Sequence, residues 1–374
     1  MRIALVHDYL SQKGGAEKVL QAFHEIWPEA PIFVLFHDKK KIKSFKNTDI
    51  RETFIKKLPG AERMFQWYLP LMPSATEKHD LNDFDVVLSS TSSFAKGVIT
   101  PPESVHICYC HTPPRFLWAG THRYLSDLPY NKVIKSFLTP LLHRLRLWDT
   151  LSTNRVDHFL SNSNTVNLRI QKYYRRQSDT IYPPVKTKDF HISKNLGNYF
   201  LAGGRLVPYK RFDLIVQAFN RLGLPIKIFG LGPELKKLKK IAKPNIEFIG
   251  YIEGEEKSKI LSECLGFINP QIEDFGITTV EATASGRPII AYRGGGATES
   301  VEENKTGIFF EKQNWQSLTD AILKFNSKNW DSQYIKEHAK KFDENIFKQK
   351  IKQTVEDRYE EFKKGQNQVQ FKNI

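Results

Sequence analysis

Short runs of apolar residues alternate with helical segments along this chain, and that alternation limits its fold more than any other feature. The runs are rich in β-branched and aromatic residues and are bounded by glycine, proline or polar turns, which is typical of buried strands. In the first half they are "RIALVH" (2–7), "PIFVLF" (31–36), "DFDVVLSS" (83–90), "SVHICYCH" (104–111) and "VDHFLSNS" (156–163). Segments such as "KGGAEKVLQAFHEIW" (13–27) between them have helical periodicity. Near-continuous apolar strands that alternate with helices predict a parallel sheet covered on both faces.

A proline-containing segment separates this alternation from a second one. In "TIYPPVKTKDF" (180–190), two prolines favour extended backbone and interrupt the pattern, which suits a linker. Strand-like runs then resume at 198–206, 225–230, 246–250, 266–270, 288–292 and 307–310. With 374 residues, the chain is long enough for two domains of ordinary size.

The fold that this pattern predicts is of the α/β class, with two Rossmann-like, doubly wound domains facing a central cleft. The first covers residues 1–183 and the second covers residues 184–345. The closing segment, 346–374, reads as a long amphipathic helix with no strand after it, so we expect it to pack back on the first domain and to end in a frayed tail. Ligands of such sheets bind beyond the carboxyl ends of the strands, so the residues there are the candidates for a site.

A formal net charge of +15 indicates anionic partners such as phosphates or acidic lipid surfaces. A lysine-rich segment at 37–57 carries part of this charge, but no nucleic-acid-binding motif accompanies it, so we expect no nucleic-acid partner. The first residues lack the apolar run and cleavage site of a signal peptide, and no stretch approaches about eighteen uncharged apolar residues. These features predict a soluble, cytoplasmic protein.

The three cysteines are too few for a disulfide framework. Cys108, Cys110 and His111 in "CYCH" resemble half of a zinc site. A second ligand cluster is missing from the sequence, because Cys264 stands alone in an apolar run. We therefore expect buried strand cysteines and no bound metal.

Two glutamates frame the most informative segment, "QIEDFGITTVEATASGRPIIAY". Glu273 lies in the loop after a predicted strand, and Glu281 lies inside the helix that begins near Gly276. Because the two are about two helical turns apart, we expect them to touch different parts of one elongated ligand rather than to act as an acid–base couple. The backbone amides at the helix start, where hydroxyls or anions can bind, are those of Phe275, Gly276 and Ile277. The alternative is two ordinary glutamates of a surface helix.

Basic residues and glycines mark two strand-to-helix turns. Arg205 and Lys210 flank the turn in "LAGGRLVPYKRFD", where Gly204 lets the backbone approach a ligand closely. An arginine and a lysine at such a place can neutralise a diphosphate, the arginine through its planar fork and the lysine as a point charge. Gly14 and Gly15 occupy the first strand-to-helix turn of the chain, again a position for phosphate or sugar. Surface charge on a loop is the alternative for the basic pair.

His111 follows an apolar strand directly and precedes two prolines that stop the strand. A histidine at this place is expected to face the ligand site rather than a core. Its imidazole can hydrogen-bond a substrate hydroxyl or move a proton. A structural histidine with satisfied hydrogen bonds is the alternative interpretation.

Together these segments resemble the retaining, nucleotide-sugar-dependent glycosyltransferases of the GT-B fold, in the large "group 1" family (family four). The resemblance extends over nearly the whole chain. Its most specific sign is the E-x7-E element "EDFGITTVE", supported by "GGRLVPYK" and "ASGRPIIA". Within the family, "GGAEKV", "CHTPPRFLW", "LRLWDTLSTNRVDHFLSNS" and "IYPPV" are similar to segments of the bacterial mannosyltransferases of surface-polysaccharide assembly.

The resemblance implies a role for each candidate residue. The implied contacts are Glu273 and the amides of Phe275, Gly276 and Ile277 at the donor sugar; Glu281 at the ribose hydroxyls; Arg205 and Lys210 at the diphosphate; Gly250 and Tyr251 beside the base; Gly14, Gly15 and Gly204 where the backbone comes close to the donor; and His111 near the reacting carbon. Of these, His111, Glu273, Arg205 and Lys210 would carry catalysis.

The implied activity is retaining transfer of a hexose, mannose from GDP-mannose, onto a saccharide or lipid-linked saccharide in surface-polysaccharide synthesis. No cofactor is expected, because Arg205 and Lys210 would stabilise the departing diphosphate without a metal. The segments 64–73 and 132–148 combine bulky apolar residues with basic ones, among them Lys132. Docking on anionic lipid at the inner face of the plasma membrane is one interpretation, and a core helix with a solvated basic edge is the other.

Three other hypotheses remain open from the residues alone. An NAD-dependent Rossmann enzyme is disfavoured, because Gly230 and Gly232 follow a strand but Leu235 takes the place of the third glycine of the fingerprint. A non-catalytic protein would bind a nucleotide sugar or a glycan without turnover. A transferase that uses UDP-glucose or UDP-GlcNAc would share the motifs, since base and sugar choice depend on loop shape.

Overall fold

The computed structural model of the protein describes residues 1–122, 125, 131–326 and 329–372. Side chains at 132–134, 137, 326 and 366–372 are not among those described, so the expectation for Lys132 lies outside the described residues. The chain divides into two compact units. Unit 1 comprises Met1–Tyr182 and Phe347–Ile374, and unit 2 comprises Pro183–Ile346.

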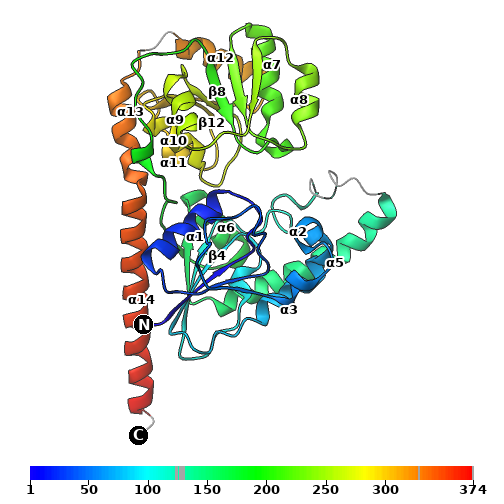
Figure 1. Cartoon of the computed structure of the whole chain (residues 1–374), viewed down its shortest axis with the longest axis vertical. Helices are drawn as coiled ribbons and strands as arrows, with labels where there is room; N and C mark the ends of the chain where they lie inside the picture. Colours follow the sequence, from blue (N-terminus) through cyan, green and yellow to red (C-terminus); the bar gives the residue numbers. More distant parts are fainter. Residues whose placement is uncertain (123–124, 126–130, 327–328, 373–374) are drawn as a thin grey trace. The chain divides into compact units, whose positions relative to one another are not determined.

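Unit 1 is built on a parallel sheet, which within the described residues has seven strands in the order β3-β2-β1-β4-β5-β6-β7 (Figure 1). The strands are β1 Ile3–His7, β2 Ile32–Val34, β3 Ile50–Glu52, β4 Val86–Thr91, β5 Val105–Cys110, β6 His158–Ser161 and β7 Ser178–Thr180. The two edge strands, "IRE" (β3) and "SDT" (β7), were not expected from the sequence. Both are short, polar and partly exposed, so they lack the apolar signature by which the inner strands were recognised.

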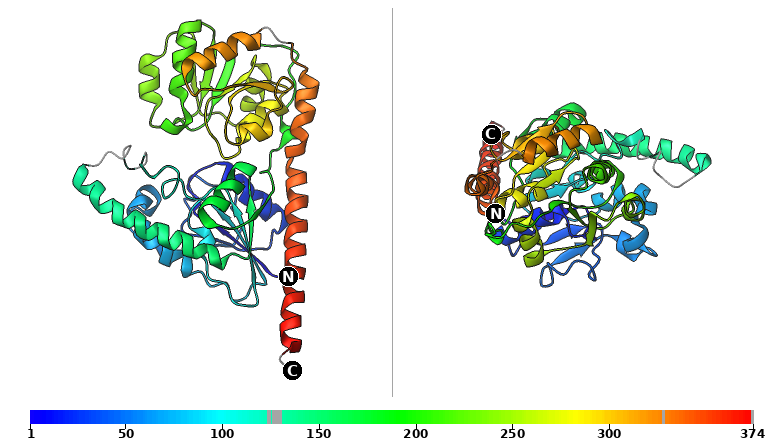
Figure 2. Two further views of the ribbon diagram at one scale, coloured as in Figure 1. Left: turned by 180° about the vertical axis from the view of Figure 1, so that it is seen from behind. Right: turned by 90° about the horizontal axis from the view of Figure 1, so that it is seen from above.

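Helices connect and cover these strands. They are α1 Gly15–Ile26, α2 Ala61–Met64, α3 Met72–Glu77, α5 Lys132–Ser152, α6 Asn164–Tyr174 and most of α14 Glu344–Lys372, with the 3₁₀ helices η1 Phe54–Lys57, η2 Phe65–Leu71, η3 Ala95–Gly97 and η4 Thr153–Arg155. The amino-terminal end of α5 points away from the sheet of unit 1, whereas its carboxyl-terminal part lies against the unit (Figure 2).

The core of unit 1 follows the two-residue alternation of its strands. Ile3 and Leu5 face one side of the sheet together with the apolar residues of α1, whereas Ala4 and Val6 belong to a second cluster on the other side. The helix α14 joins the first of these clusters. It does so through three buried residues spaced four apart, Phe347, Ile351 and Val355. The last helix is therefore part of the core of unit 1.

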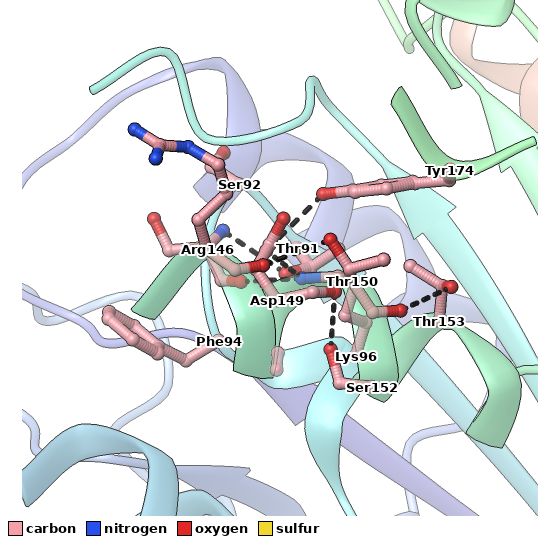
Figure 3. A network of polar contacts seen from close by, with 12 residues as sticks. Thr91, Ser92, Phe94, Lys96, Arg146, Asp149, Thr150, Ser152, Thr153 and Tyr174 are labelled. Atoms are coloured by element: carbon pink, nitrogen blue, oxygen red, sulfur yellow. Dashed lines mark hydrogen bonds and ion pairs between the residues drawn. The ribbon is translucent and has the colours of Figure 1, made fainter. Parts of the chain in front are cut away.

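A buried ion pair ties the loop after β4 to the helix α5 (Figure 3). Lys96 and Asp149 form this pair, and each side chain is only 1% exposed. The carboxylate of Asp149 also accepts hydrogen bonds from Trp118 Nε1 (2.8 Å) and the Tyr174 hydroxyl (3.3 Å). The Lys96 ammonium donates to the carbonyl of Ser93 at 3.1 Å. One buried network thus connects four segments of unit 1.

Unit 2 has a second parallel sheet, with six strands among the described residues in the order β10-β9-β8-β11-β12-β13. They are β8 Phe200–Gly203, β9 Ile226–Phe229, β10 Ile246–Gly250, β11 Phe267–Asn269, β12 Ile289–Tyr292 and β13 Gly307–Phe310. All six lie within apolar runs that the sequence predicted as strands. The order reverses direction between β8 and β11, which is the point where ligands of doubly wound sheets bind.

Helices cover both faces of this sheet. They are η5 Thr187–Asp189, η6 Pro208–Lys210, α7 Phe212–Leu222, α8 Leu235–Ile241, α9 Gly254–Glu263, α10 Ile277–Ala284, α11 Ala297–Ser300, α12 Trp315–Asn326, α13 Ser332–Ala339 and η7 Lys340–Phe342. The helices α7, α8 and α12 share one apolar cluster with the strands, and α10 packs beside α9 and α13 on the other face (Figure 1). Both units are therefore doubly wound α/β folds, as expected from the sequence.

The last helix extends further than the sequence suggested. The helix α14 continues to Lys372, whereas the sequence favoured a frayed tail after Gly365. A glycine inside a helix costs only about 1 kcal/mol relative to alanine, and no proline follows to stop the helix.

Among the helices in the described ranges, none is both long and apolar enough to cross a membrane.

Candidate functional site

The loops that follow β8, β9 and β10 are joined at the carboxyl edge of the unit 2 sheet. The amide of Gly204 donates to the carbonyl of Phe229 at 3.1 Å, and the amide of Gly230 donates to that of Gly250 at 2.6 Å. A β-carbon at Gly230 would lie 1.9 Å from the carbonyl oxygen of Gly204, so only glycine fits there. Gly230 also has a φ of 119°, which side chains disfavour. These glycines let three adjacent loops pack closely against one another at the sheet edge.

Lys210 and Glu273 meet at this edge. The two come from the loops after β8 and β11, and Lys210 Nζ donates to Glu273 Oε1 at 2.7 Å. Gly204 lies close to the ammonium, since a β-carbon there would be 3.1 Å from Lys210 Nζ. Both charged side chains are largely but not fully buried. The structure therefore brings together two of the residues that the sequence placed at the donor.

The glycines after β12 pack closely against the loop that carries Glu273. The amide of Gly296 donates to the carbonyl of Glu273 at 2.9 Å, and a β-carbon at Gly296 would lie 2.3 Å from the Cα of Phe275. The Phe275 side chain is buried, with its ring centroid 5.3 Å from that of Phe342. The next residue, Gly276, adopts a φ of 96° and precedes α10. The amides of Phe275, Gly276 and Ile277 thus lie where the sequence expected them, at the start of that helix.

Glu281 lies within α10 and is only 2% exposed. Its carboxylate forms an ion pair with Lys257 of α9. The Lys257 ammonium also lies 5.7 Å from the ring centroid of Phe229 at the end of β9. Lys257 was missed in the sequence, because in "EGEEKSKI" it looks like one of several surface charges on a helix. Its partner could be found only from the packing of α9 against α10.

The remaining donor-side candidates are more exposed. Arg205 is exposed, and its Nη2 lies 3.3 Å from the Tyr209 hydroxyl. Tyr251 follows β10 and donates to Glu253 Oε2 at 2.8 Å. Partial desolvation, together with that carboxylate, raises the pKa of Tyr251 to about 12, so the phenol stays neutral at ordinary pH. Gly250 has a φ of 78° and leaves open space where a side chain would be.

A hydrogen-bonded chain supports the loop after β11 from the side. Arg211 Nη1 donates to Gln313 Oε1 at 3.2 Å, and Gln313 Nε2 donates to the carbonyl of Pro270 at 2.8 Å. Arg211 has a φ of 56° and precedes α7, so its backbone is held in an uncommon conformation. Neither residue was singled out in the sequence. Their effect is to fix the β8 loop and the β11 loop relative to each other.

In unit 1, the candidates also lie at the carboxyl edge of the sheet. His111 directly follows β5, and its Nε2 lies 2.8 Å from the Ser90 hydroxyl at the end of β4. The side chain is only 8% exposed, so it is more buried than its place after a strand suggested. It packs edge-on against Tyr109, two residues earlier on the same face of β5.

The first turn of unit 1 places its glycines beside a carboxylate. Gly14 precedes α1 and Gly15 begins it. A β-carbon at Gly14 would lie 2.8 Å from Glu17 Oε2, so the close approach made here is to this carboxylate. Nearby, Asp8 follows β1 and accepts hydrogen bonds from the amides after β4, those of Ser92 (2.7 Å), Phe94 (2.8 Å) and Ala95 (2.7 Å). That carboxylate shapes the loop next to Ser90.

The three cysteines are buried, two of them in β5 as expected. Burial raises the pKa of Cys108 and of Cys264 to about 12, so both thiols stay protonated. Among the described residues, no three histidine, cysteine or carboxylate side chains gather in a way that could hold a metal ion.

The fold of this chain is shared with several solved structures. Solved structures that superpose on nearly the whole chain include that of Anabaena HepE in complex with UDP and glucose, with a TM-score of 0.69, 16% identity, and coverage of 95% of this chain and 99% of that one. Sucrose-phosphate synthase from Thermosynechococcus elongatus gives a TM-score of 0.69 at 14% identity and covers 96% of this chain and 99% of its own. Two Rossmann-like halves with such neighbours are the GT-B fold.

The sequence of unit 2 matches a family model. Residues 186–349 match the family model described as "Glycosyl transferases group 1". That match includes the Lys210–Glu273 pair and the whole E-x7-E element. Over these residues the chain is similar to the glycosyl transferases group 1 family.

Curated relatives are similar over part of the chain. The O-antigen chain mannosyltransferase C of Escherichia coli is 28% identical over 241 residues, which are 59% of this chain and 63% of that protein. An uncharacterized glycosyltransferase of Methanocaldococcus jannaschii is 26% identical over 215 residues, 56% of this chain and 61% of its own length. A GDP-mannose-dependent alpha-(1-6)-phosphatidylinositol monomannoside mannosyltransferase of Mycobacterium tuberculosis is 32% identical over 136 residues, 32% of this chain and 35% of that protein. The matched regions thus span less than two thirds of these relatives.

Proposed function

We propose that this chain is a retaining glycosyltransferase that moves mannose from GDP-mannose onto a saccharide acceptor, lipid-linked or free, in surface-polysaccharide synthesis. The observation that carries the proposal is the Lys210–Glu273 contact of 2.7 Å at the carboxyl edge of the unit 2 sheet. It joins a cation suited to a diphosphate and a carboxylate suited to sugar hydroxyls. The match of residues 186–349 to the group 1 family model and the similarity to mannosyltransferases support this assignment.

The chemistry that these residues offer is charge stabilisation. Breaking a glycosyl–phosphate bond leaves an oxocarbenium-like sugar and a diphosphate that carries additional negative charge. A preorganised cation beside that diphosphate lowers the barrier, because it requires no reorganisation at the moment of reaction. In the proposed reaction Lys210 and Arg205 hold the diphosphate, and Glu273 holds the sugar together with the amides of Phe275, Gly276 and Ile277.

The rest of the donor has its own proposed partners. Glu281 binds the ribose hydroxyls, Gly250 and Tyr251 border the base, and Gly204 allows the phosphates to approach the backbone. On the acceptor side, Gly15 leaves room at the turn before α1, and His111 contacts the sugar near the reacting carbon. Attack from the face of the leaving group, with the phosphate accepting the proton of the acceptor hydroxyl, accounts for retention. Because the positive charge comes from side chains, we expect turnover to be unchanged by EDTA.

Substitution of the basic pair tests the proposal. Lys210→Ala and Arg205→Ala should each lower the transfer rate more than tenfold, on the order of 1.4 kcal/mol in transition-state stabilisation. Lys239→Ala is the matched control, since it removes an exposed lysine from α8 of the same unit and should leave the rate unchanged. Full turnover and unchanged donor affinity in Lys210→Ala would refute the assignment of the diphosphate site.

A panel of donors tests which sugar nucleotide is used. Thermal shift with GDP-mannose, UDP-glucose, UDP-GlcNAc and the free nucleotides should show the largest stabilisation by GDP-mannose and GDP. Greater stabilisation by a UDP-sugar would replace the mannosyl assignment by another hexosyl transfer. Stabilisation without turnover, in an assay that includes saccharide acceptors, would favour a non-catalytic nucleotide-sugar-binding protein.

We also propose that unit 1 docks on anionic lipid, which would bring it to a lipid-linked acceptor at the inner face of the plasma membrane. Around η2, Trp67 is 65% exposed, with Met64 and Leu71 also exposed. On α5, Leu147 and Leu151 are exposed apolar residues, and basic side chains are exposed on the same helix. Apolar residues beside basic ones are the composition of surfaces that bind acidic membranes.

Liposome sedimentation at low and high salt tests this docking. Binding should require anionic lipid, weaken at high salt and decrease in Trp67→Ser. Leu323→Ser is the control, because Leu323 is 57% exposed but lies on α12 of unit 2. If the two variants bind vesicles equally, the apolar residues at η2 have no part in docking.

A further inference from the structure

A second connection joins the loop that carries Lys210 to the loop that carries Glu273. Arg211 directly follows Lys210, and its Nη1 donates to Gln313 Oε1 at 3.2 Å. Gln313 Nε2 in turn donates to the carbonyl of Pro270 at 2.8 Å, three residues before Glu273. The Lys210–Glu273 contact of 2.7 Å is the first connection. The same two loops of unit 2 are therefore held at two points, one direct and one through Gln313.

The middle of this connection needs a side chain that both accepts and donates. A guanidinium has no acceptor and a carbonyl has no proton, so the oxygen of Gln313 faces Arg211 and its nitrogen faces Pro270. A carboxylate at this position could not donate, and an ammonium could not accept. The amide of Gln313 therefore links both loops at once.

The strand order explains why one side chain reaches both loops. The order β8-β11-β12-β13 places the loops after β8, β11 and β13 at one edge of the unit 2 sheet. Gln313 lies three residues after the end of β13. The next residue, Asn314, accepts a hydrogen bond from the amide of Ser317 at 2.8 Å at the start of α12. Gln313 thus extends toward Pro270 from a backbone that is anchored at a helix.

Arg211 is held in a conformation that an arginine rarely adopts. Its φ of 56° and ψ of 35° lie in the left-handed region, where a β-carbon is disfavoured. Nε and Nη2 of Arg211 donate to the two carboxylate oxygens of Asp213 at 3.1 and 3.2 Å, and Nη1 donates to Gln313. Strained backbone persists where its surroundings over-determine it, and it is common at functional sites. Here it directly follows the short helix η6, whose last residue is Lys210.

We propose that Arg211 and Gln313 are positioning residues that hold Lys210 in place against Glu273. The inference rests on the proposed function for its catalytic consequence, in which Lys210 stabilises the departing diphosphate. A single contact between two loops lets them turn about it, whereas a second contact several residues away prevents this. Because a misplacement of about 1 Å can cost much of a transition-state interaction, loss of the second connection should lower kcat more than it raises the donor KM.

Three substitutions break the connection at different points. Arg211→Gly removes the guanidinium, and glycine adopts the left-handed conformation readily, so the backbone turn is kept. Gln313→Met removes both hydrogen bonds at similar side-chain length. Gln313→Glu keeps an acceptor for Arg211 but cannot donate to Pro270. Each should lower kcat about tenfold with the donor KM within about twofold, while the thermal midpoint of Arg211→Gly stays within about 3 °C of the wild type.

Arg175 provides a matched control in unit 1. It is also an arginine in the left-handed conformation, with a φ of 55°, and it is exposed at the end of α6. Arg175→Gly therefore makes the same change in charge and in backbone freedom, but in the other unit. It should leave kcat and the donor KM unchanged.

A double-mutant cycle with Lys210→Ala distinguishes positioning from general damage. If Arg211 acts through Lys210, Arg211→Gly should lower the remaining kcat of Lys210→Ala by less than about twofold. Hydrogen exchange of residues 267–280, followed by mass spectrometry, adds a measurement that needs no substrate. Exchange there should be faster in Arg211→Gly and in Gln313→Met than in the wild type, and unchanged in Arg175→Gly.

Each result either supports or overturns the proposal. Unchanged kcat or unchanged hydrogen exchange in Arg211→Gly and Gln313→Met refutes the positioning role, and so does an equal loss of kcat in Arg175→Gly. The same factor of loss with and without the Lys210 side chain would show that the connection does not act through that cation. Wild-type kcat in Gln313→Glu would refute the link through Pro270. Absence of transfer by the wild-type protein from every nucleotide sugar would refute the proposed function instead, while hydrogen exchange would still test the connection between the loops.

Discussion

Removal of the Lys96 ammonium tests how much the buried pair in unit 1 contributes to stability (Figure 3). Lys96→Met keeps the length and most of the volume of the side chain but leaves the Asp149 carboxylate without its cation. The carboxylate would keep two neutral donors, Trp118 Nε1 and the Tyr174 hydroxyl. Both side chains of the pair are only 1% exposed, so water cannot replace the lost partner.

The expected cost follows from this burial. Removing one member of a buried ion pair destabilises a protein by about 3 to 5 kcal/mol, because it leaves an uncompensated charge. For a unit of this size, each kcal/mol lowers the midpoint temperature by about 2 to 4 °C, so the unit 1 transition should fall by about 6 to 20 °C. Asp149→Asn should cost a comparable amount, since the Lys96 ammonium would then have only neutral partners, among them the Ser93 carbonyl and the nearby aromatic rings, in place of a carboxylate.

A double-mutant cycle separates the charge from the packing. Lys96→Met with Asp149→Asn contains no unpaired charge, and the asparagine still accepts a hydrogen bond. We expect the double variant to lose less than half of what either single variant loses, so the coupling, which is the sum of the single losses minus the double loss, should be at least about 4.5 kcal/mol. Urea unfolding followed by tryptophan fluorescence measures all four proteins, because Trp118 and Trp148 lie in the network. A cost below about 1 kcal/mol for Lys96→Met, or strictly additive losses, would refute the reasoning.

Three further predictions concern pH, the donor loop and Lys257. Burial lowers the pKa of His106 to about 4, although its hydrogen bond to the Arg155 carbonyl and the charge of Asp157 act in the opposite direction. In the unfolded chain the pKa of a histidine is about 6.5, so the unfolded state binds more protons than the folded state between pH values of about 4 and about 6.5. Stability should therefore fall by about 3 kcal/mol as pH drops from about 6.5 to about 4, and urea midpoints of His106→Gln should depend less on pH; an identical pH profile would contradict this. Gly296→Ala should displace the loop at Phe275 and lower donor affinity at least tenfold by calorimetry, whereas a control at Gly223, where a β-carbon meets nothing within 4 Å, should keep donor affinity. Lys257→Met should destabilise unit 2 by about 3 kcal/mol in urea unfolding, because it removes the cation that is paired with the buried Glu281 carboxylate. An unchanged midpoint would show that the ion pair makes no net contribution to stability.

Much of the fold was predictable because its signals are local. The inner strands are continuous apolar runs, and such runs stay buried whatever the rest of the chain does. The start of α10 was predictable for the same reason, since Gly276 and the residues after it are neighbours in sequence. The edge strands β3 and β7 were not, because a polar three-residue strand exists only where a partner strand is already present.

The candidate site was predictable in its residue types and much less in its contacts. The positions of Lys210 and Glu273 followed from strand ends, but their contact of 2.7 Å depends on β8 and β11 lying side by side. The ion pair of Glu281 with Lys257 had no signal in the sequence, since a lysine in a charged helix is usually solvated. The low exposure of His111 had none either.

By itself, the sequence determined the α/β class, the alternation of strands and helices in each half, and the turns at which glycines and basic residues fall. Only the tertiary structure decided which side chains meet. The Ser90–His111 contact and the Lys96–Asp149 pair join residues that lie 21 and 53 positions apart along the chain. Their contacts are set by strand order and register, which arise from long-range pairing and leave no pattern in any short segment of sequence.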